Sequence, residues 1–169
     1  MGLHVSIASR QCERKINRRL LKRITTTLLA DLKIKNAELG IHLVATPEMT
    51  RLNEKFLRHQ GTTDVITFDY GLGVPPSGGF PPNHTRRTNR LKPELQTLHG
   101  EIVVCVGEAV LQARKFRTNW RSEVVRYIVH GVLHLLGFDD ASAGARRKMK
   151  RQEDRLLREL SRRFPLSGL

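Results

Sequence analysis

The sequence has few cysteines, few aromatic residues and no long apolar run. Its two cysteines, Cys12 and Cys105, form no CxxC or cysteine–histidine cluster, so we expect no disulfide framework and a reducing environment. Aromatic residues make up 5% of the chain, which is a poor supply for a base-stacking platform. No apolar run approaches the roughly 20 residues of a membrane span, and the N-terminus lacks a signal-peptide layout. We therefore expect a cytoplasmic protein without a membrane partner.

Acidic residues are scarce beside basic ones. Thirty Lys and Arg stand against sixteen Asp and Glu, a formal net charge of +14 that exceeds what solubility requires. This excess predicts a polyanionic partner. Because aromatic residues are few, we expect contact mainly through the phosphates and the shape of that partner.

Two groups of basic residues recur at helical spacing. The candidate RNA-binding residues on the first predicted helix are Arg14, Lys15, Arg18, Arg19 and Lys22, with Arg23 beyond them. The last predicted helix adds Arg146, Arg147, Lys148, Lys150, Arg151, Arg155 and Arg158. Either group alone is as typical of a solvated helix face as of a nucleic-acid-binding surface. The two groups together favour RNA or DNA as the partner.

The order of elements predicts an α/β fold. At 169 residues the chain has the length of a single domain with one core. Hydrophobic periodicity predicts strands near 3–8, 39–45, 63–68 and 100–106, and helices near 11–33, 46–57, 107–116, 119–136 and 142–161. We expect a sandwich in which a small mixed four-stranded sheet packs with about five helices. Residues 71–98, rich in glycine, proline and arginine, predict a long basic loop that is either a disordered insertion or a substrate-contacting lid.

The helix predicted over 119–136 carries the strongest functional signal. His130 and His134 are four residues apart, so both rings lie on one helix face and can bind one metal ion. Gly137 then favours a helix end, after which the chain can bring Asp139 or Asp140 to the same ion. A lone histidine on an apolar helix is usually a core residue. Two at this spacing, followed by a glycine and two carboxylates, favour a metal site.

The expected site is catalytic, because three protein ligands leave a fourth position open for water. A metalloprotease of the HExxH type is disfavoured, since Gly131 stands where that motif has its general base, although Glu123 or Asp139 is a conceivable substitute. Phosphodiester hydrolysis needs an activated water, a cation near the phosphate and affinity for a polyanion. The charge of the chain suits that reaction, so a metal-dependent ribonuclease ranks above a protease.

The segment from His130 to Asp140, HGVLHLLGFDD, closely resembles the HGxLHLLGYDH signature of the YbeY endoribonucleases. The stretch from Leu52 to Phe56 is similar to the LN..(Y/F) segment of that family. TDVITF at 63–68 is similar to its PTDVLSF segment, and HGEIVVC at 99–105 to its LGDIVIC strand. The resemblance spans roughly residues 40–160 in the order of the family.

The resemblance implies a single-strand-specific endoribonuclease with one Zn²⁺ per chain and no nucleotide cofactor. It implies a role in maturation of the small-subunit ribosomal RNA 3′ end and in ribosome quality control, with ribosomal RNA and the small ribosomal subunit as partners. The implied metal ligands are His130, His134 and Asp140, although the family has histidine where this chain has Asp140. A carboxylate can complete a zinc site, so Asp140 can take the place of that histidine. Asp139 is the alternative third ligand.

The implied catalytic residues are Arg58 and His59. The family has an arginine directly after the aromatic residue of LN..(Y/F), where this chain has Leu57, and Arg58 follows one position later. A shift of one position turns a side chain by about 100° around a helix axis. At a helix end the backbone can adjust, so that Arg58 or His59 still faces the scissile phosphate. The alternative for Arg58 is an ordinary surface arginine.

A second function of a different class fits the same residues. A noncatalytic protein bound to RNA or to the ribosome would use the metal to hold the helix and the turn at Asp139 together. A DNA-binding module is weaker, because the sequence shows no recognition-helix pattern.

Overall fold

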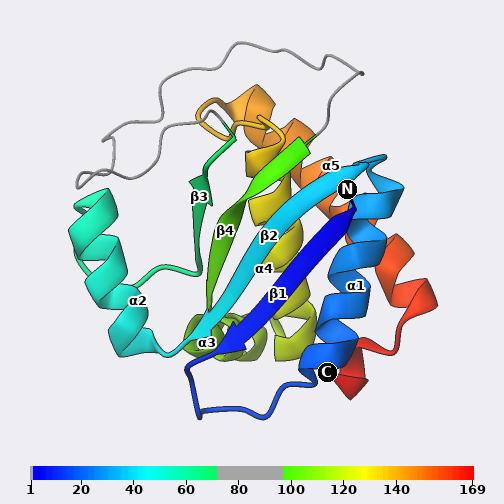
Figure 1. Cartoon of the computed structure of the whole chain (residues 1–169). Helices are drawn as coiled ribbons and strands as arrows, with labels where there is room; N and C mark the ends of the chain where they lie inside the picture. The colour runs from blue at the N-terminus through cyan, green and yellow to red at the C-terminus, as the bar shows by residue number, and fades with distance from the viewer. Residues whose placement is uncertain (1, 72–96) are drawn as a thin grey trace.

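The computed structural model describes residues 2–71 and 97–169 (Figure 1). Residues 72–96 lie outside the described part, and with them almost all of the loop predicted over 71–98. Thr97 and Leu98 are an exception that corrects the prediction, since they already belong to a strand. In the described part, no helix has both the length and the apolar character that a membrane crossing requires.

A mixed four-stranded sheet forms the centre of the molecule, as predicted. Its strands are β1 (Leu3–Ser9), β2 (Asn36–Val44), β3 (Val65–Asp69) and β4 (Thr97–Cys105), in the spatial order β1-β2-β4-β3. β1, β2 and β4 run parallel, whereas β3 pairs antiparallel with β4 at one edge. The register places Phe68 opposite Glu101 and Ile66 opposite Val103.

Five α-helices surround the sheet, which confirms the predicted α/β class. They are α1 (Arg18–Asp31), α2 (Thr46–Leu52), α3 (Val106–Phe116), α4 (Trp120–Leu135) and α5 (Ala143–Arg163). The described chain also has a π turn, η1 (Asn53–Leu57), and a short 3₁₀ turn, η2 (Leu166–Gly168). In Figure 1, α1, α4 and α5 lie behind the sheet, whereas α2 stands beside β3.

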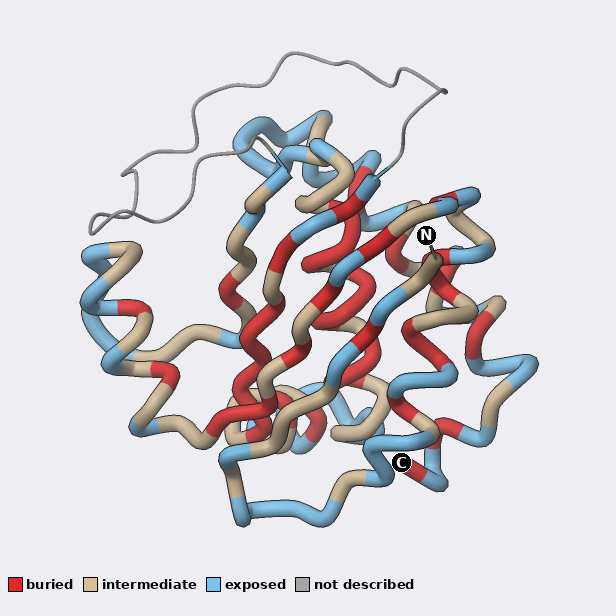
Figure 2. Tube along the Cα trace, viewed as in Figure 1, coloured by how far each residue is buried: buried red, intermediate tan, exposed pale blue. Residues whose placement is uncertain are grey.

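Alternation along β4 explains why the two faces of the sheet carry different cores. Ile102 and Val104 point into the large core shared with α1, α4 and α5. Val103 and Cys105 point to the opposite face, where they join Met49 of α2 in a smaller core. Figure 2 shows the buried residues concentrated along β2, β4 and the helix behind them. The helix that carries the two histidines is therefore supported along its whole length.

The first helix is shorter than predicted. It begins at Arg18 instead of near residue 11, because the Asn17 side chain accepts a hydrogen bond from the N–H of Leu20 and caps the helix there. Arg14 precedes the helix in a turn that the Gln11 side chain closes, donating to the Arg14 carbonyl and accepting from its N–H. Arg14 and Lys15 are thus exposed but not helical, and the predicted stripe on this helix is reduced to Arg18, Arg19, Lys22 and Arg23.

The helix predicted over 46–57 also differs. It is α-helical only as far as Leu52, and the next five residues form the π turn η1. A π turn holds one more residue per turn than an α turn, so it absorbs an extra residue without breaking the helix. Arg58 follows η1 in a left-handed conformation with φ of 55°.

Gly131 lets α4 approach β4 closely. A Cβ atom at this position would lie 2.9–3.1 Å from three side-chain carbons of Ile102, which is fully buried. Two of these distances are shorter than real Cβ contacts, and a close-packed interior resists the shift of Ile102 that would relieve them. Packing thus favours glycine between the two histidines.

We predict that Gly131→Ala lowers the free energy of unfolding by about 1–2 kcal/mol, because overpacking outweighs the better helix propensity of alanine. Urea unfolding followed by circular dichroism measures the change. Gly144→Ala is the matched control, since Gly144 is also helical and a Cβ atom added there would have no neighbour within 4 Å. Equal stability of Gly131→Ala and the wild type would contradict this account of the packing.

Candidate metal centre

The C-terminal half of α4 brings the partly exposed His130 and His134 to the surface, while most of the helix packs into the core. The Asn119 side chain caps the helix by accepting from the N–H of Arg121. At the other end, Gly137 has a φ of 87°, and its N–H donates to the carbonyl of His134. This left-handed residue reverses the chain and returns the segment that follows toward the histidines.

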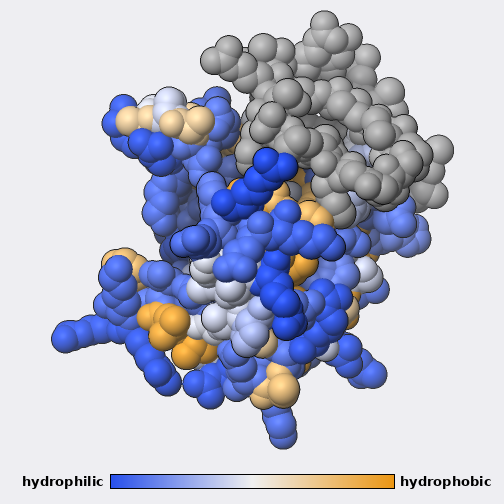
Figure 3. Space-filling view, turned by 90° about the vertical axis from the view of Figure 1, so that its left-hand side faces the viewer, coloured by the Kyte–Doolittle hydropathy of each residue, from blue (hydrophilic) through white to orange (hydrophobic). Residues whose placement is uncertain are grey.

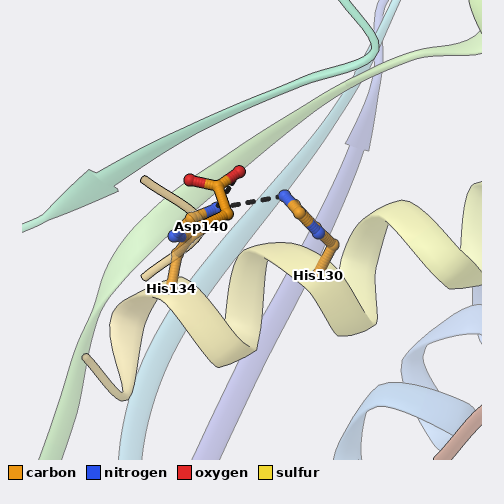
Figure 4. A group of neighbouring side chains, drawn as sticks. All are labelled: His130, His134 and Asp140. Carbon is orange, nitrogen blue, oxygen red and sulfur yellow. Dashed lines mark hydrogen bonds and ion pairs between the residues drawn. The ribbon is translucent and has the colours of Figure 1, made fainter. Parts of the chain in front are cut away.

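His130, His134 and Asp140 form a compact group of potential ligands. One ligand atom from each lies within 4.8 Å of the others. The two Nε2 atoms are 3.0 Å apart, and Nε2 of His134 is 4.0 Å from Oδ2 of Asp140. Figure 4 shows both rings on the same side of α4, with the carboxylate beside His134. The histidine side chains are 28% and 29% exposed, so solvent and a ligand can reach them.

The other ring nitrogen of each histidine is bound to the protein. Nδ1–H of His130 donates to Oε2 of Glu153 at 3.1 Å, and Nδ1–H of His134 donates to the carbonyl of Phe138 at 3.1 Å. These bonds fix the tautomer in which both Nε2 atoms carry a lone pair. Metal-binding histidines are usually oriented by a carboxylate or a carbonyl in this way.

The geometry of the group fits a metal ion. Two lone pairs directed at each other across 3.0 Å repel unless a proton or a cation lies between them. A tetrahedral ion with metal–ligand bonds near 2.0–2.1 Å separates its ligand atoms by roughly 3.3 Å. The observed separations of 3.0 and 4.0 Å lie on either side of that value.

Glu153 is the most strongly held carboxylate near the site. It is 6% exposed and accepts a hydrogen bond of 2.7 Å from Nη1 of Arg126 and one of 3.2 Å from Lys150. Burial on its own would raise the pKa of Glu153, but the hydrogen bonds from His130 and Arg126 and the charges of Lys150 and Arg126 outweigh it. Together they lower the pKa from 4.5 to about 2, so the group is ionised at neutral pH.

Asp139 and Asp140 have different roles. Oδ1 of Asp139 accepts a hydrogen bond of 2.7 Å from the N–H of Ala141, so this side chain closes the turn between α4 and α5. Asp140 supplies the carboxylate of the group, and its backbone carbonyl is held by Arg146. The structure therefore favours Asp140 over Asp139 among the two alternatives that the sequence leaves open.

The position that follows the first histidine, where the HExxH motif has its general base, holds Gly131. The space beside Gly131 is filled by Ile102, which leaves no room for a glutamate side chain. Glu123 lies seven residues before His130, about 10 Å along the helix. It is buried and accepts a hydrogen bond from Thr118 at 2.7 Å. A protease mechanism therefore lacks its proton carrier at this helix.

Arg58 and His59 lie in the exposed turn after η1. The buried Asn53 side chain holds this turn by donating to the carbonyls of His59, at 3.3 Å, and Gly61, at 2.8 Å. Among the described residues, no interaction joins Arg58 or His59 to the histidines of α4. Their proposed catalytic role stays a prediction.

Sequence reasoning missed two parts of the site, Arg126 and the orienting role of Glu153. A signal for Glu153 was present, because Met149, Glu153, Leu156 and Leu160 recur at helical spacing and the glutamate is the one charged member of an apolar stripe. A buried acid in such a stripe needs a partner. The Phe138 carbonyl left no trace in the sequence, since any residue supplies a carbonyl.

Comparison with known proteins decides the family. A family model described as "Endoribonuclease YbeY" matches residues 5–161. The chain belongs to the YbeY family. The Chlorobium luteolum protein named Endoribonuclease YbeY is 30% identical over 149 residues, 88% of this chain and 93% of that protein. The protein of the same name from Chlorobium phaeovibrioides is 35% identical over 66% of this chain and 61% of its own length.

A solved structure supports the fold of this YbeY-family chain. The solution structure of TM1509 from Thermotoga maritima superposes with a TM-score of 0.58 at 21% sequence identity. The match covers 92% of this chain and 88% of that one. At this identity the likeness concerns the fold, which agrees with the four-stranded sheet and five helices described above.

We predict that Glu153→Gln weakens metal affinity about 10- to 100-fold, because the amide no longer holds the His130 ring with a full negative charge. Competition between the protein and a zinc chelator measures the affinity. Glu159→Gln is the matched control on the same helix, since Glu159 pairs only with the exposed Arg155 among the described residues. Wild-type affinity in a folded Glu153→Gln protein would show that the hydrogen bond to His130 does not support the site.

Proposed function

We propose that this chain is a zinc-dependent endoribonuclease that cleaves single-stranded RNA. The observation that carries the proposal is the group of two histidines and one carboxylate backed by Glu153, in a YbeY-family chain with a formal charge of +14. The relatives named above carry the name Endoribonuclease YbeY. By extension, we propose a role in small-subunit ribosomal RNA 3′ end maturation and in ribosome quality control, within the cytoplasm.

The donor set supports zinc, with one ion per chain. Two imidazoles and one carboxylate are a ligand set found in catalytic zinc sites. The carboxylate adds negative charge compared with a third imidazole, which makes a bound water less acidic and extends the tolerance of the site toward harder metals. We therefore expect Zn²⁺ to bind and Mn²⁺ to be a workable substitute.

The accessibility of the group favours catalysis over a structural role. Structural zinc sites are closed by four protein ligands, whereas three described side chains gather here and all three are partly exposed. This observation ranks the enzyme above the alternative, a noncatalytic protein that binds RNA or the ribosome and uses metal only to brace the α4–α5 turn.

Different residues would orient the metal ligands, bind the phosphate and transfer the proton. When bound, the ion would lower the pKa of water and offset charge on the phosphate. Glu153 and the Phe138 carbonyl accept hydrogen bonds from the two Nδ1 atoms and so orient both Nε2 atoms toward one point. Arg58 would hold the nonbridging oxygens of the scissile phosphate through its guanidinium, and His59 would move a proton to or from an RNA oxygen.

The basic surface would bind the RNA strand outside the cleavage position. Arg18, Arg19 and Lys22 are exposed on α1 and suit phosphate contacts. The face over α2 and β3 is predominantly hydrophilic, with its apolar side chains in small separate patches (Figure 3). A hydrophilic face of this kind suits a charged polymer better than an apolar ligand.

We predict that the purified protein cleaves a labelled single-stranded RNA and that His134→Ala lowers the rate more than about 100-fold. Chelation should abolish the wild-type activity, and added zinc should restore it. His4→Ala, a change at an exposed histidine on β1, is the matched control and should retain full activity. Equal cleavage by His134→Ala and the wild type, or activity that survives chelation, would contradict the proposal.

The same assay separates Arg58 from the metal ligands. Arg58→Ala should lower kcat about 100-fold with bound zinc unchanged, and Arg58→Lys should restore part of the rate. Arg51→Ala, on the exposed side of α2, removes one positive charge nearby and should have little effect. An unchanged kcat for Arg58→Ala would contradict the catalytic role and show that Arg58 is an ordinary surface arginine.

A further inference from the structure

An arginine-lined groove lies where α3 ends and α4 begins, at the opposite end of α4 from the histidines. It has a volume of about 540 Å³, and its lining includes Arg14, Arg114, Arg117, Trp120 and Arg121. Three separate segments meet there: the turn before α1, the last turn of α3 and the start of α4. The non-helical position of Arg14, which removes it from the predicted stripe on α1, is what brings it to this groove.

The positive charge of the groove is largely uncompensated. Arg121 is held in place, since its Nε donates to the backbone carbonyl of Leu169 at 2.7 Å and its guanidinium lies 4.6 Å from the Trp120 ring centroid. Arg14, Arg114 and Arg117 are exposed, and the ion pairs among the described residues include none of them. Three exposed arginines that form no ion pair attract an anion.

An exposed aromatic residue, Phe116, belongs to the same last turn of α3 as Arg114. Phe116 is 63% exposed, and of the described large hydrophobic residues only Phe116 and Leu111 are exposed. It directly precedes Arg117, whose φ of 54° ends α3, and the ammonium group of Lys115 lies 5.3 Å from the ring centroid. Basic side chains and an exposed aromatic ring on one helical turn are a combination by which proteins hold single-stranded nucleic acid.

We propose that this α3–α4 corner, defined by Arg14, Arg114, Phe116 and Arg117, is a second binding site for single-stranded RNA, remote from the metal centre. The arginines hold consecutive phosphates, and the Phe116 ring stacks on a base. The inference rests on the proposed function, in which RNA is the substrate. A simple anion would use the arginines alone, whereas a nucleotide strand uses the ring as well.

The distance between the two sites sets the length of RNA required. Arg121 precedes His130 by nine residues and His134 by thirteen, which is about 14–20 Å along α4. A stacked strand advances about 3.4 Å per nucleotide, so it needs at least about four to six nucleotides to reach from the corner to the metal centre. Shorter RNA occupies one site at a time.

Fluorescence anisotropy of labelled single-stranded RNA tests whether the arginines contribute to binding. The measurement is made in the presence of a chelator, so that the strand stays intact. For an RNA of about 16 nucleotides, Arg114→Gln/Arg117→Gln should raise Kd about tenfold and flatten the slope of log Kd against log salt by about 1.4. Lys33→Gln/Lys35→Gln is the matched control. It removes two exposed charges at the α1–β2 turn, and Lys33, like Arg117, has a positive φ.

Stacking has a separate signature in the same assay. Phe116→Ala should raise Kd at least about fivefold and leave the salt slope unchanged, because the lost contact carries no charge. Phe116→Trp should bind as well as the wild type or better, since it keeps an aromatic face. An unchanged Kd for both the arginine double variant and Phe116→Ala would overturn the inference. So would an equal loss in the Lys33/Lys35 control, because the effect would then be one of net charge.

Cleavage assays distinguish this inference from the proposed function. The arginine double variant should lower kcat/KM about tenfold on the longer RNA and leave it unchanged on an RNA of about two nucleotides, which is too short to span both sites. An equal loss on both lengths would place these arginines at the metal centre instead and overturn the inference. Absence of cleavage by the wild type would count against the proposed function alone, because the binding measurements do not depend on it.

Discussion

The hydrogen bond between Glu153 and His130 is the interaction on which the site depends. It joins α5 to α4 across 23 residues of sequence and fixes which nitrogen of the ring faces the ligand group. Glu153 can serve there as a buried anion because, against the effect of burial, the hydrogen bonds from His130 and Arg126 and the charges of Lys150 and Arg126 lower its pKa to about 2. The same contacts pack α5 against α4, so the metal centre and the helix pair are stabilised by one network.

The sheet determines where that network can act. Gly131 brings α4 against Ile102 of β4, and the alternation of β4 leaves its other face for the small core beneath α2. Most of α4 is buried, and Arg126 in its middle is engaged by Glu153 and Asp154. The C-terminal part of the helix presents the candidate metal ligands and its start meets the arginine groove, which places two chemically different candidate sites on one helix.

The features that depend on residues close together in the sequence could be predicted from it. The spacing of His130 and His134 indicated a shared helix face, and the four strands and five helices were found in the predicted order. Features set by contacts between distant residues were not predictable in the same way, as the orienting role of Glu153 shows. The predicted start of the first helix was wrong because the Asn17 side chain caps the helix and the basic residues before it stay outside. Arg14 therefore lies in the groove at the α3–α4 corner instead of on the face of α1.

X-ray absorption at the zinc edge of the zinc-loaded protein tests the central claim most directly. The account predicts one ion per chain, bound by two imidazole nitrogens near 2.0–2.1 Å and by oxygen near 2.0–2.2 Å, with no sulfur ligand. In Asp140→Ala one oxygen contribution should change while the imidazole signal stays. A spectrum with one imidazole or none, or a protein that binds no zinc after reconstitution, would contradict the account.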